Sequence, residues 1–390
     1  MEQESAQFLL SANGRDILSF IESLSKEPLE TGKILRNRYP SVKPSHLSAA
    51  VELSVARKKG ITKFSRAGEM FFTRETLEQS TGEGIASHCA ERFSGIDRTL
   101  DACCGIGGDS IALGKVVNSL TCMDISPVHL AFCKENLRIR GIEAEMVEAD
   151  ITEMKDSLSG YIAVFMDPSR RIDSKRSFDP SKMSPPLSEV IDILGKVPCG
   201  AAKLPTSINS YDISIPHELE WISNADGLKE AVMWTGGFAR CRTSVTLLHE
   251  NVSLNDIMLS GGEPEINKAG GYLYEPDPAL IRSGLLGRKA VSAGLWLIND
   301  KIAYMSSDKY VQDPFFTAYR ILKCLDFNLK VIERELRDMD AGILTVKKRG
   351  FPMLPEEIAG KIKLDGKKAV TIVATKELGK SKVFIVERLN

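Results

Sequence analysis

Short apolar runs alternate with longer amphipathic segments over the middle of the chain, between about residues 98 and 168. A short apolar run bounded by polar or glycine residues is typical of a buried strand. The segment SPVHLAFCKENLRIRG instead repeats its apolar residues at helical spacing, with Ser126 as N-cap, Pro127 in the first turn and Gly141 as the stop. Strands that alternate with helices predict a parallel sheet with right-handed crossovers. We expect strands at 99–103, 119–124, 144–150 and 161–168, and helices at 107–117 and 126–141.

The N-terminal segment, residues 1–92, lacks this alternation and is predicted to be helical. Apolar residues recur every three or four positions in 8–24, and 44–60 has the form of a capped helix that ends at glycine. The Met-Phe-Phe triplet at 70–72 is expected to be buried, and Thr73 is expected to cap the helix that follows it.

The second half of the chain is patterned less regularly. Strands are expected at 199–204, 229–236 and 241–248, before a segment rich in Gly and Pro that is typical of a connector with one short helix. The last stretch predicts a compact α+β module, with helices at 313–325, 329–339 and 354–364 and strands at 341–350, 367–377 and 381–389. The expected organisation is a helical region (1–92), an α/β domain (93–255), a connector (256–310) and an α+β domain (311–390).

Composition narrows the class of protein without changing this outline. The 390 residues carry a net charge of −1 and an ordinary apolar content, which indicates a soluble globular chain of two or three domains. No apolar run has the length of a membrane helix, and MEQESAQFLL lacks the basic start and apolar core of a signal peptide, so we expect a cytoplasmic protein. The eight cysteines include no pair at zinc-ligand spacing, so reduced thiols and no metal site are expected.

The neutral total conceals a basic C-terminus. Residues 320–390 contain 16 Lys and Arg against 10 Asp and Glu. A basic module on an acidic body favours a polyanionic partner such as a nucleic acid, although a charged face can equally be only solvated. Within this module, Lys347, Lys348 and Arg349 follow a predicted strand and precede a glycine, as a basic loop that tracks a phosphate backbone would, or as a solvated strand end.

A glycine turn after the first predicted strand is the main candidate for a binding site. It reads Asp101-x-x-x-Gly105-x-Gly107-Gly108. It lacks the third glycine of a dinucleotide fingerprint and the Lys-Ser/Thr of a phosphate-binding loop. An oxidoreductase that binds NAD is therefore disfavoured, and the glycines predict a close approach of the backbone to a ligand.

Carboxylates at the ends of the next three strands add to this candidate site. Asp124 ends the second strand, where it can accept hydrogen bonds from ribose hydroxyls. Asp150 ends the third strand, within reach of an adenine amino group, and Asp167 ends the fourth strand, facing a second substrate. Any one of them could simply cap a helix, but with Asp101 they form a row of acids along one edge of the sheet.

This pattern resembles the Rossmann-like fold of class I S-adenosylmethionine-dependent methyltransferases over residues 98 to about 250. The resemblance implies S-adenosylmethionine as cofactor, with Asp101, Gly105 and Gly107 at its methionine moiety, Asp124 at the ribose and Asp150 at the adenine. The neighbouring residues Cys103, Ile125 and Ile151 complete the implied cofactor set.

A narrower resemblance covers nearly the whole chain. The chain is similar to bacterial methyltransferase-like proteins with a C-terminal THUMP-like domain, a resemblance that implies RNA as partner. The glycine segment also resembles that of the cap-trimethylguanosine synthases, which favours methylation of a base. The segments that carry the narrower resemblance are MFFTRETLEQST, DACCGIGGDSIAL, DPSRR, FDPSKMSPP, KEAVMWTGG, YEPDPALIRSGL and KKRG.

The turn after the fourth strand is the candidate for catalysis. Amino methyltransferases place [Asn/Asp/Ser]-Pro-Pro-aromatic here, so that the first side chain accepts from the target amine. This chain keeps Asp167-Pro168 but continues Ser169-Arg170-Arg171, without the second proline or the aromatic residue. The departure weakens the case for methylation of an exocyclic amine. The two arginines are predicted to hold phosphates or stack on a base, or instead to pair with acids such as Asp173.

Other candidates lie outside these motifs. Cys199, in the single Pro-Cys pair, would be the nucleophile if the target were carbon 5 of cytosine. Trp234 and Phe238 are predicted either to form a stacking platform or to pack in the core. The sequence therefore predicts a methyltransferase that modifies RNA, and leaves open a catalytically inactive RNA-binding protein that retains the fold.

Overall fold

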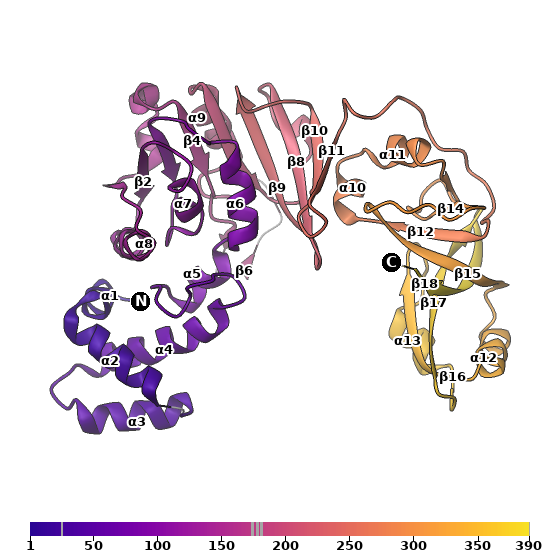
Figure 1. Cartoon of the computed structure of the whole chain (residues 1–390), viewed down its shortest axis with the longest axis horizontal. Helices are drawn as coiled ribbons and strands as arrows, with labels where there is room; N and C mark the ends of the chain where they lie inside the picture. Colours follow the sequence, from indigo (N-terminus) through magenta and orange to yellow (C-terminus); the bar gives the residue numbers. More distant parts are fainter. Residues whose placement is uncertain (25, 173–174, 177–178, 180–181, 390) are drawn as a thin grey trace. The chain divides into compact units, whose positions relative to one another are not determined.

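The computed structural model describes residues 1–24, 26–172, 175–176, 179 and 182–389 of the chain (Figure 1). It divides into two compact units. Unit 1 comprises Met1–Leu219 and Glu230–Arg240, and unit 2 comprises Glu220–Lys229 and Cys241–Asn390.

Helices form the N-terminal part of unit 1, as predicted. The Met-Phe-Phe triplet is fully buried among them, and Thr73 caps the following helix by accepting a hydrogen bond from the Thr76 N–H at 3.1 Å. Both predictions are confirmed. The helices are α1 (Gln3–Leu10), α2 (Ala12–Ser23), α3 (Pro28–Arg38), α4 (Pro44–Gly60), α5 (Arg74–Gln79) and α6 (Glu83–Glu91).

A largely parallel sheet follows, as the alternation of strands and helices predicts. The order is β9-β7-β4-β1-β2-β3, in which β9 alone of these six strands runs antiparallel to its neighbour. The strands are β1 (Thr99–Ala102), β2 (Leu120–Asp124), β3 (Glu145–Glu148), β4 (Ala163–Met166), β7 (Cys199–Leu204) and β9 (Gly227–Gly236).

Helices and short elements connect these strands. The helices are α7 (Gly108–Leu113), α8 (Pro127–Ile139) and α9 (Leu187–Gly195), the 3₁₀ turns are η1 (Ile151–Glu153), η2 (Lys155–Gly160) and η4 (Ser210–Asp212), and the short strands are β5 (Arg171–Ile172) and β6 (Lys175–Arg176). β8 (His217–Asn224) is not a connector: it is the neighbour of β9 in the strand order of the sheet.

The register of this sheet gathers the ends of four strands at one edge. Ala102 of β1 pairs with Met123 of β2 and Met166 of β4, and Met166 pairs with Ala202 of β7. The residues that follow these pairs lie side by side at the carboxyl ends of the four strands, because parallel strands share their carboxyl edge. They are Cys103, Asp124, Asp167 and Lys203.

One side chain joins the N-terminal helices to this edge. The carboxamide of Asn136 in α8 accepts from the Phe71 N–H at 2.7 Å and donates to the Phe71 carbonyl at 2.9 Å. The same nitrogen donates to the carbonyl of Ile106 in the glycine turn at 2.9 Å. Since Asn136 is fully buried, these bonds are protected from water and fix the helical region against the turn.

Unit 2 contains a mixed sheet of seven strands in the order β13-β14-β12-β15-β18-β17-β16, in which β16 and β17 run parallel. Its strands are β12 (Tyr272–Pro276), β13 (Trp296–Leu297), β14 (Met305–Ser307), β15 (Phe316–Asp326), β16 (Ala341–Lys348), β17 (Lys368–Glu377) and β18 (Lys380–Arg388). The unit also contains the antiparallel pair β10 (Thr243–Leu247) and β11 (Val252–Asn255), and the helices α10 (Pro278–Arg282), α11 (Leu286–Ser292), α12 (Leu329–Asp338) and α13 (Pro355–Gly360).

Two expectations for unit 2 differ from the structure. The apolar pattern of residues 313–325 predicts a helix, but most of them form β15, which pairs with β12 on one side and β18 on the other. Pairing with two distant strands overrides a local apolar pattern that fits either element. The expected connector, 256–310, supplies β12, β13 and β14 to the same sheet, because its glycines and prolines separate short strands rather than unfolding the segment.

Candidate active site

The glycine turn leaves β1 through a left-handed backbone. Cys103, Gly105 and Gly107 all have positive φ, at 67°, 55° and 84°. A Cβ at Gly107 would lie 2.8 Å from the sulfur of Cys133 in α8, so this glycine is required for packing. A Cβ at Gly105 would meet no described atom within 4 Å. Gly105 therefore faces open space, as the floor of a ligand site would.

Asp124 holds the shape of this turn. Its Oδ2 accepts a hydrogen bond from the Gly105 N–H at 2.9 Å, and its Oδ1 accepts from the Ser126 N–H at 2.9 Å. The Nδ1 of His129 lies 3.2 Å from the same Oδ1, a contact that the sequence does not suggest. Ile125, the next residue, is 68% exposed. An apolar side chain therefore stands in the open beside a buried carboxylate.

Asp101 lies inside β1 rather than at its end and is fully buried. Its Oδ2 accepts from the hydroxyl of Ser110, whereas its Oδ1 is buried and has no hydrogen-bond partner among the residues that the structure describes. Burial raises the pKa of the Asp101 carboxyl well above its ordinary range. An orphaned buried oxygen of this kind is stabilised by a cation or a donor that binds beside it.

Asp150 caps a 3₁₀ turn after β3. Its Oδ1 accepts from the Thr152 N–H at 2.9 Å and from the Thr152 hydroxyl at 2.8 Å. The side chain is exposed, while Ile151 is buried beneath it. The capping role that the sequence left open is therefore present, and the exposed carboxylate also remains accessible to a ligand.

A second cluster surrounds Asp167 and contains side chains that the sequence analysis did not select. The ammonium of Lys203, on β7, lies 2.5 Å from both carboxylate oxygens of Asp109 in α7 and 3.5 Å from Oδ2 of Asp167. The hydroxyl of Thr81 donates to Oδ2 of Asp167 at 3.5 Å and accepts from Lys203. A charged residue inside the apolar run CGAAKL was the available signal, because lysine is almost never fully buried unless it is paired.

The electrostatics of this cluster favour a charged lysine. Burial alone would lower the pKa of Lys203, but the carboxylates of Asp109 and Asp167 outweigh it and raise the pKa above its ordinary value. The Asp167 side chain itself remains 20% exposed. The cluster thus contains one partly exposed carboxylate, that of Asp167, which is contacted by the buried ammonium of Lys203.

Arg170 is held within the fold. Its guanidinium lies 3.1 Å from Oε2 of Glu230 on β9 and donates to the Leu204 carbonyl at 3.3 Å. Burial opposes the charge of Arg170, but Glu230 and then Asp167 raise its pKa. The geometry thus supports the interpretation that Arg170 orders the loop, with Glu230 as the partner. Pro168 is buried, and both the Arg171 side chain and the expected partner Asp173 lie outside the described residues.

The remaining candidates lie away from this edge. Cys199 begins β7, at the end of that strand opposite to Lys203. Trp234 is fully buried, with the Arg92 guanidinium 4.2 Å from its ring centroid, and Phe238 packs on Phe93 with centroids 4.5 Å apart. Trp234 and Phe238 are therefore core residues.

The basic residues at the end of β16 have partners of their own. Lys347 forms an ion pair with Glu275 at 2.5 Å, and Lys348 donates to the Phe351 carbonyl at 3.3 Å. Arg349 donates to the Ala303 carbonyl at 2.7 Å. All three are half-buried, so the predicted basic loop is ordered by contacts within unit 2.

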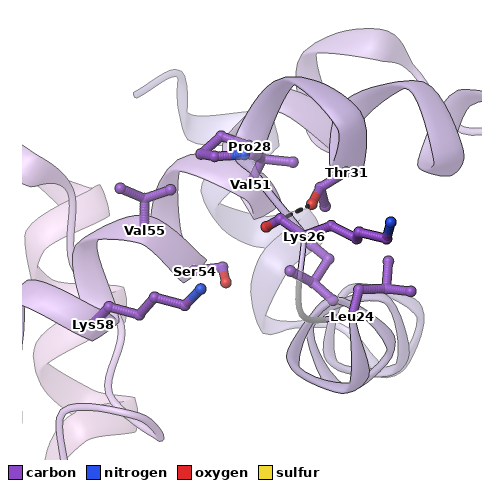
Figure 2. A pocket seen from close by; sticks show the side chains of 9 residues that line it. Leu24, Lys26, Pro28, Thr31, Val51, Ser54, Val55 and Lys58 are labelled. Carbon is purple, nitrogen blue, oxygen red and sulfur yellow. Dashed lines mark hydrogen bonds between the residues drawn. The ribbon is translucent and has the colours of Figure 1, made fainter.

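A pocket in the N-terminal region lies apart from these residues. It is lined by residues of α2, α3 and α4 and by Leu24 and Lys26, and Thr31 beside it donates to the Lys26 carbonyl at 3.5 Å (Figure 2). None of the predicted site residues lines it. Within the described part of the chain, no helix is long and apolar enough to span a membrane, and no group of three or more His, Cys, Asp or Glu side chains could hold a metal ion.

Comparison with known proteins agrees with this geometry. Residues 96–186 match the family of RNA cap guanine-N2 methyltransferases, and residues 316–388 match the THUMP domain-like family. Proteins from two strains of Mycobacterium tuberculosis, each named an uncharacterized S-adenosylmethionine-dependent methyltransferase, are 27% identical over 341 residues, which is 84% of this chain and 92% of theirs. The crystal structure of a putative methyltransferase from Porphyromonas gingivalis superposes with a TM-score of 0.76 at 17% identity, over 96% of this chain and 98% of that one.

The fold and these matches define the class: the chain is a class I methyltransferase with a C-terminal THUMP-like domain. S-adenosylmethionine is the methyl donor of this class. More particularly, its methyltransferase segment is similar to enzymes that act on the N2 amine of guanine in RNA caps.

The residues present fit this cofactor. The orphaned Oδ1 of Asp101 suits an ammonium, as in a methionine moiety. The open space at Gly105 allows close approach of the ligand. Asp124 retains acceptor capacity for ribose hydroxyls, and the exposed Ile125 offers an apolar surface to an adenine ring.

Proposed function

We propose that this protein transfers a methyl group from S-adenosylmethionine to a base in RNA, either tRNA or rRNA. The observation that carries the proposal is the partly open carboxylate of Asp167, which leaves β4 at the same sheet edge as Asp124 and the glycine turn. The matched guanine-N2 methyltransferase segment includes Asp167 and Pro168 and supports this assignment. We place the activity in the cytoplasm, where these RNAs occur.

Methyl transfer requires that the protein orient the target nitrogen toward the cofactor; it does not require a nucleophilic side chain in the protein. When bound, the cofactor supplies a methyl group on a sulfonium, which needs an in-line lone pair from the target. Asp167 accepts a hydrogen bond from an N–H of the base and so orients the nitrogen toward the cofactor site. Asp101, Asp124 and Asp150 hold the cofactor, and Arg170 keeps the turn after β4 in place through Glu230.

The THUMP-like domain is proposed to bind the RNA. Lys361, Lys363, Lys367 and Lys368 are exposed, and no ion pair involves them among the described residues. They flank the start of β17, whose Lys368 pairs with Ala341 at the beginning of β16. We name this group the lysine loop and propose that it contacts the phosphate backbone. Lys347, Lys348 and Arg349, at the other end of β16, are the second candidate surface.

Mass analysis of nucleosides tests the proposal. RNA is prepared from cells with the gene, without it, and with Asp167→Ala in its place. We expect one methylated nucleoside to be absent from the deletion strain, restored by the wild-type gene and not restored by Asp167→Ala.

An unchanged nucleoside profile contradicts the proposed activity. If RNA still crosslinks to the protein in that case, the chain is an RNA-binding protein that retains a methyltransferase fold. Two features favour this second function: the incomplete Asp-Pro-Pro-aromatic pattern and the Arg170–Glu230 ion pair.

A further inference from the structure

Lys203 makes more contacts with carboxylates than are needed to neutralise its buried charge. Its side chain is completely buried, and an unpaired ammonium in such a place would be strongly destabilising. Asp109 already supplies both oxygens of its carboxylate at 2.5 Å, which compensates the charge. The additional approach of Asp167 at 3.5 Å is therefore not needed to neutralise Lys203.

The contacts of Asp167 leave one of its oxygens open. Both described contacts, from Lys203 and from Thr81, reach Oδ2. Thr81 is itself fixed by Lys203, so the ammonium acts on the carboxylate directly and through a hydroxyl. With Oδ2 engaged from the protein side, Oδ1 is the oxygen that remains for a donor outside the protein.

The cluster also links this carboxylate to the cofactor turn. Asp109 lies in the first turn of α7, two residues after Gly107. The pair of Asp109 and Lys203 therefore connects the helix that follows the glycine turn with the end of β7. The position of the Asp167 carboxylate is thereby set relative to the same turn that approaches the cofactor, which is the alignment that methyl transfer needs.

We propose that Lys203 is a positioning residue for methyl transfer: together with Thr81 it holds Oδ2 of Asp167, so that Oδ1 accepts a hydrogen bond from the N–H of the base that is methylated. This inference rests on the proposed function and restricts the target to a nitrogen that carries hydrogen. The lone pair of that nitrogen forms the new N–C bond, the C–S bond of the donor breaks with its electron pair on sulfur, and the nitrogen releases one proton to water.

The test compares turnover with cofactor affinity in matched variants. Methyl transfer is measured with labelled S-adenosylmethionine and total RNA from cells that lack the gene, and S-adenosylhomocysteine binding is measured by calorimetry. The variants are Lys203→Met, Lys203→Arg, the double variant Lys203→Met with Asp109→Asn, and Thr81→Val. Lys289→Met is the control, because it removes a lysine from a largely buried pair, with Asp313, in unit 2.

We expect kcat to fall about 100-fold in Lys203→Met and in the double variant, while the affinity for S-adenosylhomocysteine stays unchanged. Lys203→Arg should recover part of kcat, Thr81→Val should lower it about tenfold, and Lys289→Met should leave it intact. The double variant and Thr81→Val keep the test decisive if the buried Asp109 alone prevents Lys203→Met from folding. An undiminished kcat in folded variants overturns the proposal, and so does a parallel loss of cofactor affinity.

A wild-type protein that methylates no RNA would refute the proposed function instead. Crystal structures of the wild type and Thr81→Val then decide the positioning role separately. A single Asp167 conformer in the wild type and several in the variant would support it, and the same single conformer in both would overturn it.

Discussion

The Oδ2 of Asp124 accepts a hydrogen bond from the backbone N–H of Gly105 at 2.9 Å, which ties the end of β2 to the glycine turn after β1. One carboxylate thus shapes the turn, and we propose that it also accepts hydrogen bonds from the ribose of the cofactor. We expect Asp124→Ala to remove both effects and to abolish binding of S-adenosylmethionine, whereas Asp124→Asn keeps an acceptor and binds weakly.

Calorimetric titration with S-adenosylmethionine, S-adenosylhomocysteine and NAD measures this effect. The wild type should bind the first two ligands and not NAD, and circular dichroism should show that both variants remain folded. Unchanged affinity in Asp124→Ala would remove the ribose assignment, and binding of NAD would favour an oxidoreductase.

The two glycines of the turn should respond differently to the same substitution. Gly105→Ala adds a methyl group to open space at positive φ, so we expect it to lower the free energy of unfolding by about 1 kcal/mol and to block cofactor binding. Gly107→Ala places its methyl 2.8 Å from the sulfur of Cys133, so we expect a loss of roughly 2–4 kcal/mol. Thermal unfolding together with calorimetry separates the two; equal losses of stability would contradict the difference in packing.

Replacing the lysine loop with glutamine should weaken RNA binding, because the substitution removes charges that neutralise phosphates. The variant changes Lys361, Lys363, Lys367 and Lys368, and its comparison variant changes Lys347, Lys348 and Arg349 to glutamine. For the first variant, we expect the slope of log affinity against log salt to become shallower by roughly 0.7 for each phosphate of single-stranded RNA that is no longer neutralised. The change should be smaller in the second, whose side chains are held within the domain. If the second variant changes the slope more than the first, the RNA-binding surface is instead at the end of β16.

Glu135 should contribute to stability in a manner that depends on pH. Burial would raise its pKa, but hydrogen bonds from Arg138 and Arg15 outweigh burial and lower the pKa to about 2. Because the folded pKa lies below the unfolded one, the stabilisation is present above about pH 4.5 and is lost as the pH falls toward 2. We expect Glu135→Gln to cost about 1 kcal/mol at pH 7, discounted for the exposure of the arginines.

Urea unfolding of Glu135→Gln and the wild type between pH 7 and pH 2 measures this difference. The two stabilities should converge as the pH falls. A constant difference across this range would show that the Arg15 and Arg138 contacts do not act through the carboxylate charge.

Much of unit 1 was predictable because its signals are local. The alternation of apolar runs and amphipathic segments, the glycine turn and the row of acids each occupy a short stretch of sequence, and the parallel sheet follows from them. The buried triplet and the cap at Thr73 were predictable for the same reason. Local reasoning failed at 313–325, where the same apolar residues suit a helix or a strand until β12 and β18 pair with them.

The sequence by itself determined the class of fold and selected the candidate acids, since a strand, a turn and a helix start are encoded by neighbouring residues. Only the tertiary structure decided which charges meet. Lys203 lies 94 positions from Asp109 and 122 from Thr81, and Arg170 lies 60 from Glu230. Pairs at such separations form because the sheet brings the strand ends together and because an unpaired buried charge is strongly destabilising. Neither the proximity nor the burial can be read from a short stretch of sequence.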